Sequence, residues 1–304
     1  RETHTLHLVA STGDLIEPRT LETIGTNLYE SLFPDELKEL WRKRIRGNVK
    51  SIQIVSDEPW IPWELIRPTY REEDGSIQED GFLCEDYLVG RWLAGSPPPV
   101  ELRLKQGTYI IPKDSNLLYA HMEAEVLKCL GVNIYPTPPS LQHVRMLFSA
   151  GGYDLIHFAC HANFEPDRHE QSTILLENQE KLMAREIVGR QCNFGFLHHP
   201  LVFVNACRSA RSDLSFLAGI GSWAERFVQA KSSAFIGCAW SVDDDAAYRF
   251  AEEFYQQLKV GHSLGESVRK ARIAAKSIPG STSWLSYVLY GDPLARIMVA
   301  KSVA

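Results

Sequence analysis

Residues 155–163 read LIHFACHAN and residues 201–209 read LVFVNACRS, and these two stretches decide the fold. Each begins with a near-continuous apolar run, which is typical of a strand buried on both faces of a parallel sheet. In such sheets the reactive groups lie just beyond the carboxyl ends of the strands, where several loops converge. If the two strands are neighbours, the sheet brings the imidazole of His161 and the thiol of Cys207 into one cleft.

The sequence around these stretches alternates between strand and helix patterns. We expect strands at residues 107–112, 132–135, 154–160, 201–204, 233–240 and 287–289, and helices at residues 119–130, 141–149, 222–230, 246–258 and 264–278. Apolar strands that alternate with helices predict an α/β fold with a mostly parallel sheet flanked by helices.

The first hundred residues follow a less regular pattern. We expect a strand at 5–10, helices at 20–32 and 36–46 (the second capped by Asp35), a strand at 51–55 and an exposed polar loop at 69–80. The run Ser96-Pro97-Pro98-Pro99 is a linker signal, because consecutive prolines neither donate to a sheet nor continue a helix. The predicted organisation is an N-terminal half, residues 1–99, and a second half, residues 100–304. Trp60 and Trp63 are predicted to anchor the first half on the second.

Composition excludes several classes of protein. The 304 residues are 44% hydrophobic and 23% charged, and the net charge is -6, so no global field attracts nucleic acid or an anionic membrane. No apolar run approaches the roughly 18 residues of a membrane span, and the chain opens without an apolar leader, so we expect a cytoplasmic protein. No Cys-x-x-Cys pair occurs, which favours reduced thiols. The six cysteines are Cys84, Cys129, Cys160, Cys192, Cys207 and Cys238.

A cysteine and a histidine at neighbouring strand ends have the arrangement of a catalytic dyad. A thiol is a good nucleophile, and a nearby imidazole and a following helix N-terminus raise its thiolate fraction. The tetrahedral intermediate of acyl transfer needs backbone donors. The amides of Cys207 and Ala162 are the predicted donors, because both residues are expected in turns, outside the hydrogen-bond ladder of the sheet.

Four segments in order along the chain, together with an earlier one, resemble CHAT domains, which are caspase-like, separase-related peptidases widespread in bacteria. The four segments are residues 157–162, 204–210, 237–244 and 287–293, and the earlier one is residues 57–65. The resemblance implies His161 as the dyad histidine and Cys207 as the nucleophile. It also implies that residues 1–99 form a pseudo-peptidase or scaffold half. Ala162 stands where caspases usually have glycine, and Asn205 occupies a position that lines the first specificity pocket in caspase relatives.

The resemblance implies a function as well as a fold. It implies a cysteine endopeptidase that cleaves a specific partner protein through an acyl-enzyme intermediate. Members of the family are commonly fused to TPR repeats or sensor domains in bacterial defence systems, which implies control by such a domain or by a regulatory subunit. Two alternatives stay open: a non-catalytic interaction module in which the dyad is inert, and a nucleotide-binding α/β domain.

Several nearby residues have a structural interpretation. His157 lies inside a predicted strand and is expected to be a core histidine, and Cys160 is expected to pack beneath the site. A metal site formed by His157, Cys160, His161 or His169 is disfavoured, because positions four apart on a strand are separated by about 13 Å. Residues 219–224 match a dinucleotide-binding pattern but do not follow a strand, so we expect a loop entering a helix. No metal and no cofactor are expected.

Three consecutive aspartates follow the predicted strand at 233–240. One of Asp243, Asp244 and Asp245 is expected to N-cap the helix that begins near Ala246. The loop that holds them lines the substrate groove in caspase-like enzymes. Asp243 and Asp244 are therefore predicted to contact substrate and to favour a basic or neutral residue before the scissile bond.

Overall fold

The computed structural model describes residues 17–58, 61–72, 74–163, 171–187, 192–207 and 217–299. Its centre is a 10-stranded sheet whose main path runs β1-β4-β13-β12-β11-β8-β6-β7. The strands are β1 (Ser51–Val55), β4 (Leu88–Trp92), β13 (Tyr287–Tyr290), β12 (Ala234–Cys238), β11 (Leu201–Cys207), β8 (Leu155–Asn163), β6 (Gln106–Ile110) and β7 (Asn133–Pro136). Neighbours on this path are parallel except β12 and β13.

A short hairpin completes the sheet beside the end of β8. Strand β9 (Thr173–Leu175) runs antiparallel to the last three residues of β8, and β10 (Lys181–Met183) runs antiparallel to β9. Strand β6 pairs with β8 only at residues 155–158. The hairpin takes the place of β6 along the same edge of β8 at residues 161–163.

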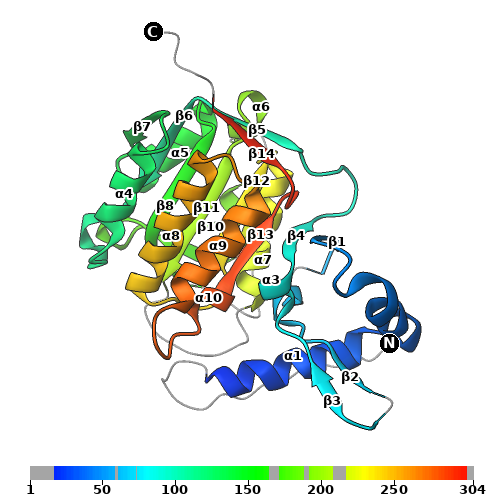
Figure 1. Ribbon diagram of the computed structural model, residues 1–304. Coiled ribbons are helices and arrows are strands. Elements are labelled where there is room, and N and C mark those ends of the chain that lie inside the picture. Colours follow the sequence, from blue (N-terminus) through cyan, green and yellow to red (C-terminus); the bar gives the residue numbers. More distant parts are fainter. Residues whose placement is uncertain are drawn as a thin grey trace.

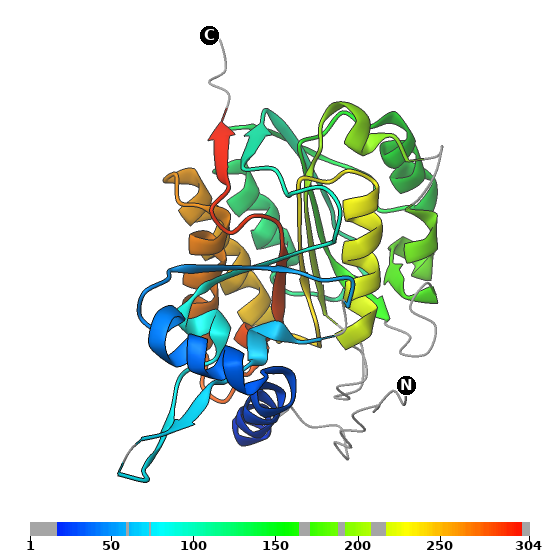
Figure 2. The same cartoon turned by 90° about the vertical axis from the view of Figure 1, so that its right-hand side faces the viewer.

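Helices cover both faces of the sheet, as the two views show (Figures 1 and 2). The orange helices α8 (Asp244–Lys259) and α9 (Leu264–Lys276) lie on one face with α4 (Ala120–Lys128), and the yellow helix α7 (Leu217–Gln229) lies on the other. The remaining helices are α1 (Pro18–Leu32), α2 (Asp35–Leu40), α3 (Leu83–Asp86), α5 (Leu141–Ala150), α6 (Phe194–Leu197) and α10 (Ser283–Ser286). The predicted α/β class, with a mostly parallel sheet flanked by helices, is confirmed.

The two apolar runs are central strands because both of their faces are covered. Ile156 and Phe158 of β8 and Val202 and Phe203 of β11 are completely buried. Both strands are longer than predicted: β8 extends to Asn163 and β11 to Cys207. His161 and Cys207 therefore lie within the last residues of their strands and not beyond them.

The N-terminal segment joins the same sheet. Strand β4 pairs with β13, and β1 pairs in parallel with β4 along all five of its residues. Gly90 is required at this junction, since a Cβ there would lie 2.5 Å from the carbonyl oxygen of Gly291. Arg91 forms a buried ion pair with Glu64, and its guanidinium carbon lies 5.7 Å from the ring centre of Tyr290. The boundary near residue 99 stays a prediction.

Several local predictions differ from the structure. The expected loop at 69–80 contains an antiparallel pair, β2 (Thr69–Arg71) with β3 (Ile77–Glu79), and β5 (Glu101–Leu104) pairs in parallel with β14 (Arg296–Val299). The expected helix at 36–46 consists of α2 followed by a π-helical turn at Trp41–Ile45, and no side chain caps its start. Trp63 packs against a core cluster formed by residues of both halves, so its role as an anchor between the halves stays a prediction. Trp60 and the expected strand at 5–10 lie outside the described residues.

Across the described ranges, no helix combines the length and the apolar character needed to cross a bilayer.

Candidate active site

The predicted dyad residues are partners in the register of two neighbouring strands. Parallel strands β8 and β11 pair residue for residue from Leu155 with Leu201 to His161 with Cys207. Neighbouring strands lie about 4.8 Å apart, so the backbones of His161 and Cys207 lie side by side. The prediction that the two strands are neighbours is confirmed. The imidazole of His161 is half-buried, and the thiol of Cys207 lies outside the described part of the chain.

A backbone carbonyl fixes the proton position on His161. Nε2 of His161 lies 2.6 Å from the carbonyl oxygen of Ser115. A carbonyl oxygen only accepts, so Nε2 carries a proton, and the lone pair of the neutral ring is then on Nδ1. Ser115 ends a 3₁₀ turn that follows β6, and its hydroxyl donates to Pro112 O at 2.8 Å. Sequence reasoning missed this partner, since a backbone acceptor has no side-chain signature.

Beneath the dyad lies a buried network formed by Glu123, His157, Asn205, Tyr255 and Tyr287. Oε2 of Glu123 is 2.8 Å from Nε2 of His157 and accepts from Nδ2 of Asn205 at 2.8 Å. The hydroxyl of Tyr255 lies 2.8 Å from Nδ1 of His157, and that of Tyr287 donates to Oδ1 of Asn205 at 3.0 Å. The network ties β8 and β11 to helices α4 and α8, a few residues below His161 and Cys207. His157 is a satisfied core histidine, as predicted.

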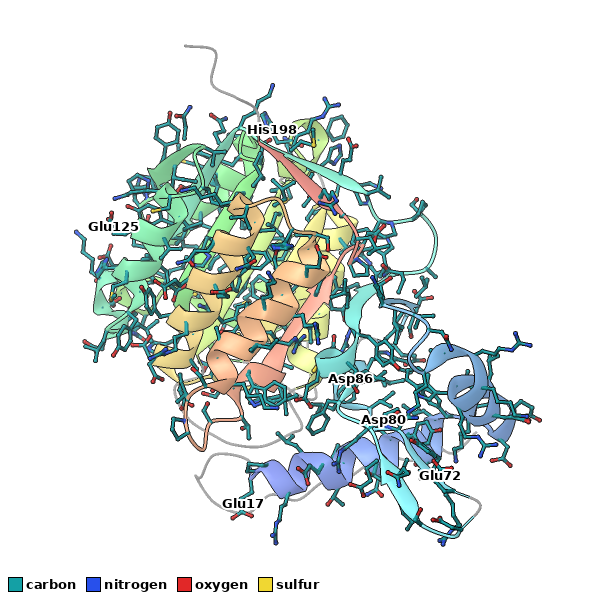
Figure 3. The ribbon with its side chains drawn as sticks, in the orientation of Figure 1. Glu17, Glu72, Asp80, Asp86, Glu125 and His198 are labelled. Atoms are coloured by element: carbon teal, nitrogen blue, oxygen red, sulfur yellow. The ribbon has the colours of Figure 1, made fainter. Side chains whose placement is uncertain are left out.

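The electrostatics of the network are consistent with one arrangement of protons. Burial raises the pKa of Glu123, and burial also holds the pKa of Tyr255 well above its ordinary value. Tyr255, which keeps its proton, therefore donates to Nδ1 of His157, and the other ring nitrogen then donates to an oxygen of Glu123. Glu125, two residues further along α4, instead projects outward, and its side chain is 71% exposed (Figure 3).

The three buried cysteines with resolved pKa shifts are poor nucleophiles. Burial raises the pKa of Cys84 and of Cys238 to about 12, and it raises that of Cys160 further. Cys160 is completely buried, which confirms the prediction that it packs beneath the site. At neutral pH these thiols stay protonated.

Ala162 and Cys207, the predicted oxyanion residues, lie in strands instead of turns, and Asn205, the predicted pocket residue, is buried. Ala162 lies inside β8 and pairs with Ile174 of β9, so the expectation that it occupies a turn is wrong. Cys207 is likewise the last residue of a strand. Asn205 is 2% exposed, and its amide donates to Glu123 and to the carbonyl oxygen of Ala247 at 3.1 Å. Asn205 is therefore part of the buried network and not of an open pocket.

The carboxylates of Asp243 and Asp244 hold neighbouring segments of the chain. Oδ2 of Asp243 accepts from the hydroxyls of Ser281 at 2.5 Å and Ser283 at 3.0 Å. Oδ2 of Asp244 accepts from the N–H groups of Leu118 at 2.7 Å and Tyr119 at 3.3 Å. Asp243 occupies the N-cap position of α8, but its side chain makes no capping bond, so the predicted side-chain cap is not formed by this residue.

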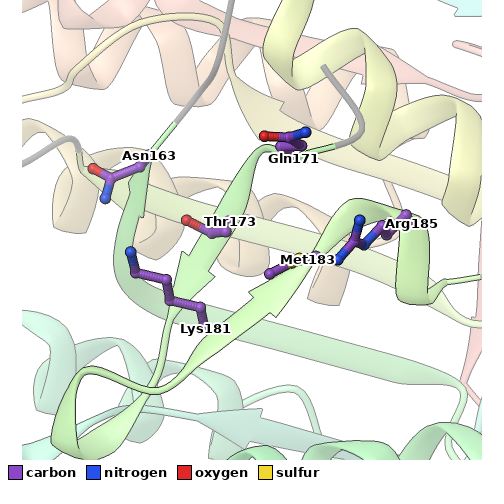
Figure 4. A pocket seen from close by; sticks show the side chains of 6 residues that line it. All are labelled: Asn163, Gln171, Thr173, Lys181, Met183 and Arg185. Atoms are coloured by element: carbon purple, nitrogen blue, oxygen red, sulfur yellow. The ribbon is translucent and has the colours of Figure 1, made fainter. Parts of the chain in front are cut away.

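Neither a metal site nor a dinucleotide-binding loop is formed by the described residues. Among the described residues, no three His, Cys, Asp or Glu side chains are placed to hold a metal ion, and His169 lies outside them. The dinucleotide-like stretch 219–224 lies inside α7, which begins at Leu217, and not in a loop. A cavity of about 320 Å³ does lie at the end of β8, beside the hairpin (Figure 4).

Comparison with known proteins gives a family and a fold. Residues 122–292, more than half of the chain, match the model of the CHAT domain family. A search of curated proteins found no match. The Arg-specific cysteine proteinase gingipain R is 14% identical, with a TM-score of 0.57 over 92% of this chain and 68% of that one. The complex of the pro- and mature domains of RgpB from Porphyromonas gingivalis gives 12% identity and 0.56 over 92% and 70%. A structure described as a protease gives 11% and 0.53 over 85% and 67%.

Proposed function

Because the chain belongs to the CHAT domain family, we propose that it is a cysteine endopeptidase in which Cys207 attacks a peptide carbonyl carbon and His161 transfers the protons. One observation supports this most: the strand register sets Cys207 beside His161, whose Nε2–H is held by the carbonyl of Ser115. That bond orients the ring and leaves the Nδ1 lone pair for the chemistry, as in other dyads whose base is positioned by a third group.

The proposed reaction has two halves. Nδ1 of His161 accepts the thiol proton of Cys207, and the thiolate adds to the scissile carbonyl to give a tetrahedral intermediate. The imidazolium then protonates the leaving amine as the C–N bond breaks, which leaves a thioester on Cys207. Water, deprotonated by the same nitrogen, attacks the thioester and releases the acid. The amide of Cys207, at the end of β11, is the proposed oxyanion donor, and the proposal does not extend to Ala162, which pairs with Ile174 inside the sheet.

The family resemblance supports more specific proposals about substrate and control. We propose cleavage of a specific partner protein in the bacterial cytoplasm, controlled by a fused or associated TPR or sensor domain in a defence or signalling system. Asp243 and Asp244 were predicted to contact substrate. Because both carboxylates have partners within the chain, we do not extend the proposal to a basic residue before the scissile bond.

The test is cleavage of a proteome-derived peptide library by the full chain, together with its regulatory domain where one exists. Cys207→Ala and His161→Ala should each lower single-turnover cleavage by ~10³-fold or more, as losses of dyad members do elsewhere. Cys129→Ala is the matched control, because this thiol is exposed and lies at the C-terminal end of α4. Full turnover in either dyad variant would refute the mechanism. Partner binding without cleavage by the unmodified chain would favour the interaction module.

A further inference from the structure

The cavity at the end of β8 lies on the same open face as His161. Its lining residues come from the end of β8 and from the hairpin, and Figure 4 shows their side chains around one space. Along β8, His161 and Asn163 are half-buried while Ala162 between them is buried. Along β10, Lys181 is exposed and Met183 is half-buried, while Leu182 between them is buried. The lining residues are Asn163, Gln171, Thr173, Lys181, Met183 and Arg185.

The strand register gives the separation between the cavity and the dyad. Cys207 pairs with His161, His161 with Leu175, and Leu175 with Lys181, so the four residues form one row across β11, β8, β9 and β10. With strands about 4.8 Å apart, the backbone of Lys181 lies ~10 Å from that of His161. The hairpin lies on the side of His161 that faces away from Cys207.

Among the described residues, the lining of the cavity is basic and its cations have no ion-pair partner. Two lining residues, Lys181 and Arg185, are cations and none is an acid. Within the part of the chain that the structure describes, neither cation forms an ion pair. Two neighbouring carboxylates of the described chain have partners elsewhere: Glu186 accepts from Arg145 at 2.7 Å, and Glu180 accepts from the N–H of Leu141 at 2.6 Å.

The hydroxyl of a largely buried residue, Thr173, gives a second, independent indication of a ligand. Thr173 lines the cavity and is 6% exposed, and its hydroxyl has no hydrogen-bond partner in the described residues. Two cations and a hydroxyl around one space match the chemistry of a carboxylate, which accepts several hydrogen bonds at once.

The direction of the substrate follows from the role of His161. The general acid must lie beside the leaving amine, so the residues that follow the scissile bond continue from His161 toward the hairpin. An extended peptide advances about 3.3 Å per residue, and ~10 Å therefore corresponds to the second or third residue after the bond.

We infer that this cavity is a substrate subsite that binds the carboxylate side chain of an aspartate or glutamate two or three residues after the scissile bond. The inference rests on the proposed peptidase function, and it concerns residues that take no part in the bond-breaking step. Lys181 and Arg185 supply the charge, and Thr173 donates its hydroxyl proton to the carboxylate.

Product sequencing after digestion of the peptide library tests the inference. New N-termini released by the unmodified chain should be enriched in acidic residues at their second or third position. The double variant Lys181→Glu/Arg185→Glu should reverse the preference to basic residues, with kcat/KM changed by about tenfold for matched acidic and basic peptides. Arg249→Glu/Lys259→Glu is the control, since it changes the charge equally on exposed positions of α8. No acidic enrichment, or enrichment unchanged in the Lys181→Glu/Arg185→Glu variant, would overturn the inference.

Two further arms separate this inference from the proposed function. Peptides with amidated C-termini should keep the preference, and its loss would show that the cavity holds a terminal carboxylate instead, against the inference. If the unmodified chain cleaves nothing, the peptidase proposal fails, and binding still tests the cavity. A fluorescein-labelled tetraglutamate amide should bind the Cys207→Ala chain, and the charge-reversal pair Lys181→Glu/Arg185→Glu should weaken its affinity by tenfold or more. Equal affinity in both proteins would overturn the subsite.

Discussion

Replacing Glu123 by alanine should destabilise the whole fold, although Glu123 is a single carboxylate on a nine-residue helix. It is 2% exposed, and one oxygen accepts from both His157 and Asn205. The substitution leaves two buried N–H donors without an acceptor, and each costs about 1–3 kcal/mol. The expected loss is therefore about 2–6 kcal/mol of unfolding free energy, a large part of a typical total of 5–15 kcal/mol.

Urea denaturation of the full chain measures this loss. Glu123→Ala should shift the midpoint to lower urea without changing the slope. Glu125→Ala on the same helix is the matched control: that exposed carboxylate pairs only with Lys128, and its loss should cost about 0.3 kcal/mol. Equal midpoints for the two variants would refute the view that the buried network holds β8 and β11 in place.

The pH dependence of Glu123→Gln has a defined sign. Burial raises the pKa of Glu123, so the folded chain holds this proton more tightly than the unfolded chain does. The carboxyl group therefore favours folding most below its unfolded pKa of about 4.3, and this contribution is lost as pH rises through the folded value. The destabilisation by Glu123→Gln should accordingly be smaller at pH 8 than at pH 5. A destabilisation that grows with pH would contradict the direction of the shift.

Three other outcomes are expected. Glu64→Ala should cost about 3–5 kcal/mol in urea denaturation, because it leaves a buried guanidinium without its carboxylate, and adding Arg91→Met should recover much of that loss. The hydrogen bond from the N–H of Ser263 lowers the pKa of Glu266. Glu266→Gln should therefore lower the unfolding free energy by about 0.5 kcal/mol at pH 7, and by nothing once acid has protonated the wild-type carboxyl group. A loss that persists below pH 3 would exclude this capping bond as the cause. Iodoacetamide at pH 8 should leave Cys238 unmodified in the folded chain and modify it in urea, because a pKa of about 12 leaves a thiolate fraction of ~10⁻⁴. Rapid labelling of Cys238 in the folded chain, detected by mass spectrometry, would contradict its burial.

The central part of the fold was predictable because its signal is local. The apolar runs of β8 and β11 identify buried parallel strands without reference to any other segment. Strand β4 was not predicted, since it contains Gly90 and Arg91, both unusual in a buried strand. Both residues are explained by contacts with segments that are distant in sequence. A side chain at position 90 would collide with the backbone of Gly291, and Glu64 neutralises the charge of Arg91.

The site was predictable to a similar extent. Two reactive side chains at the ends of apolar strands indicated the position of a candidate active site. The register of β8 and β11 sets His161 beside Cys207. The catalytic roles of these two residues stay a proposal. The hairpin β9–β10 was missed, because strands of three residues are too short to show a period of two. The basic cavity that it lines was therefore not predicted either.

The position of β13 in the sheet has a consequence for synthesis of the chain. This strand, Tyr287–Tyr290, lies between β4 and β12, so it joins the N-terminal strands to the rest of the sheet. Until the ribosome has made β13, strands β1 and β4 lack the neighbouring strand that connects them to the sheet, and we expect their apolar side chains to stay exposed. Completion of the sheet thus depends on residues that the ribosome adds long after β4. Chaperone capture of nascent chains that end before residue 287 should be strong and should fall once β13 has emerged.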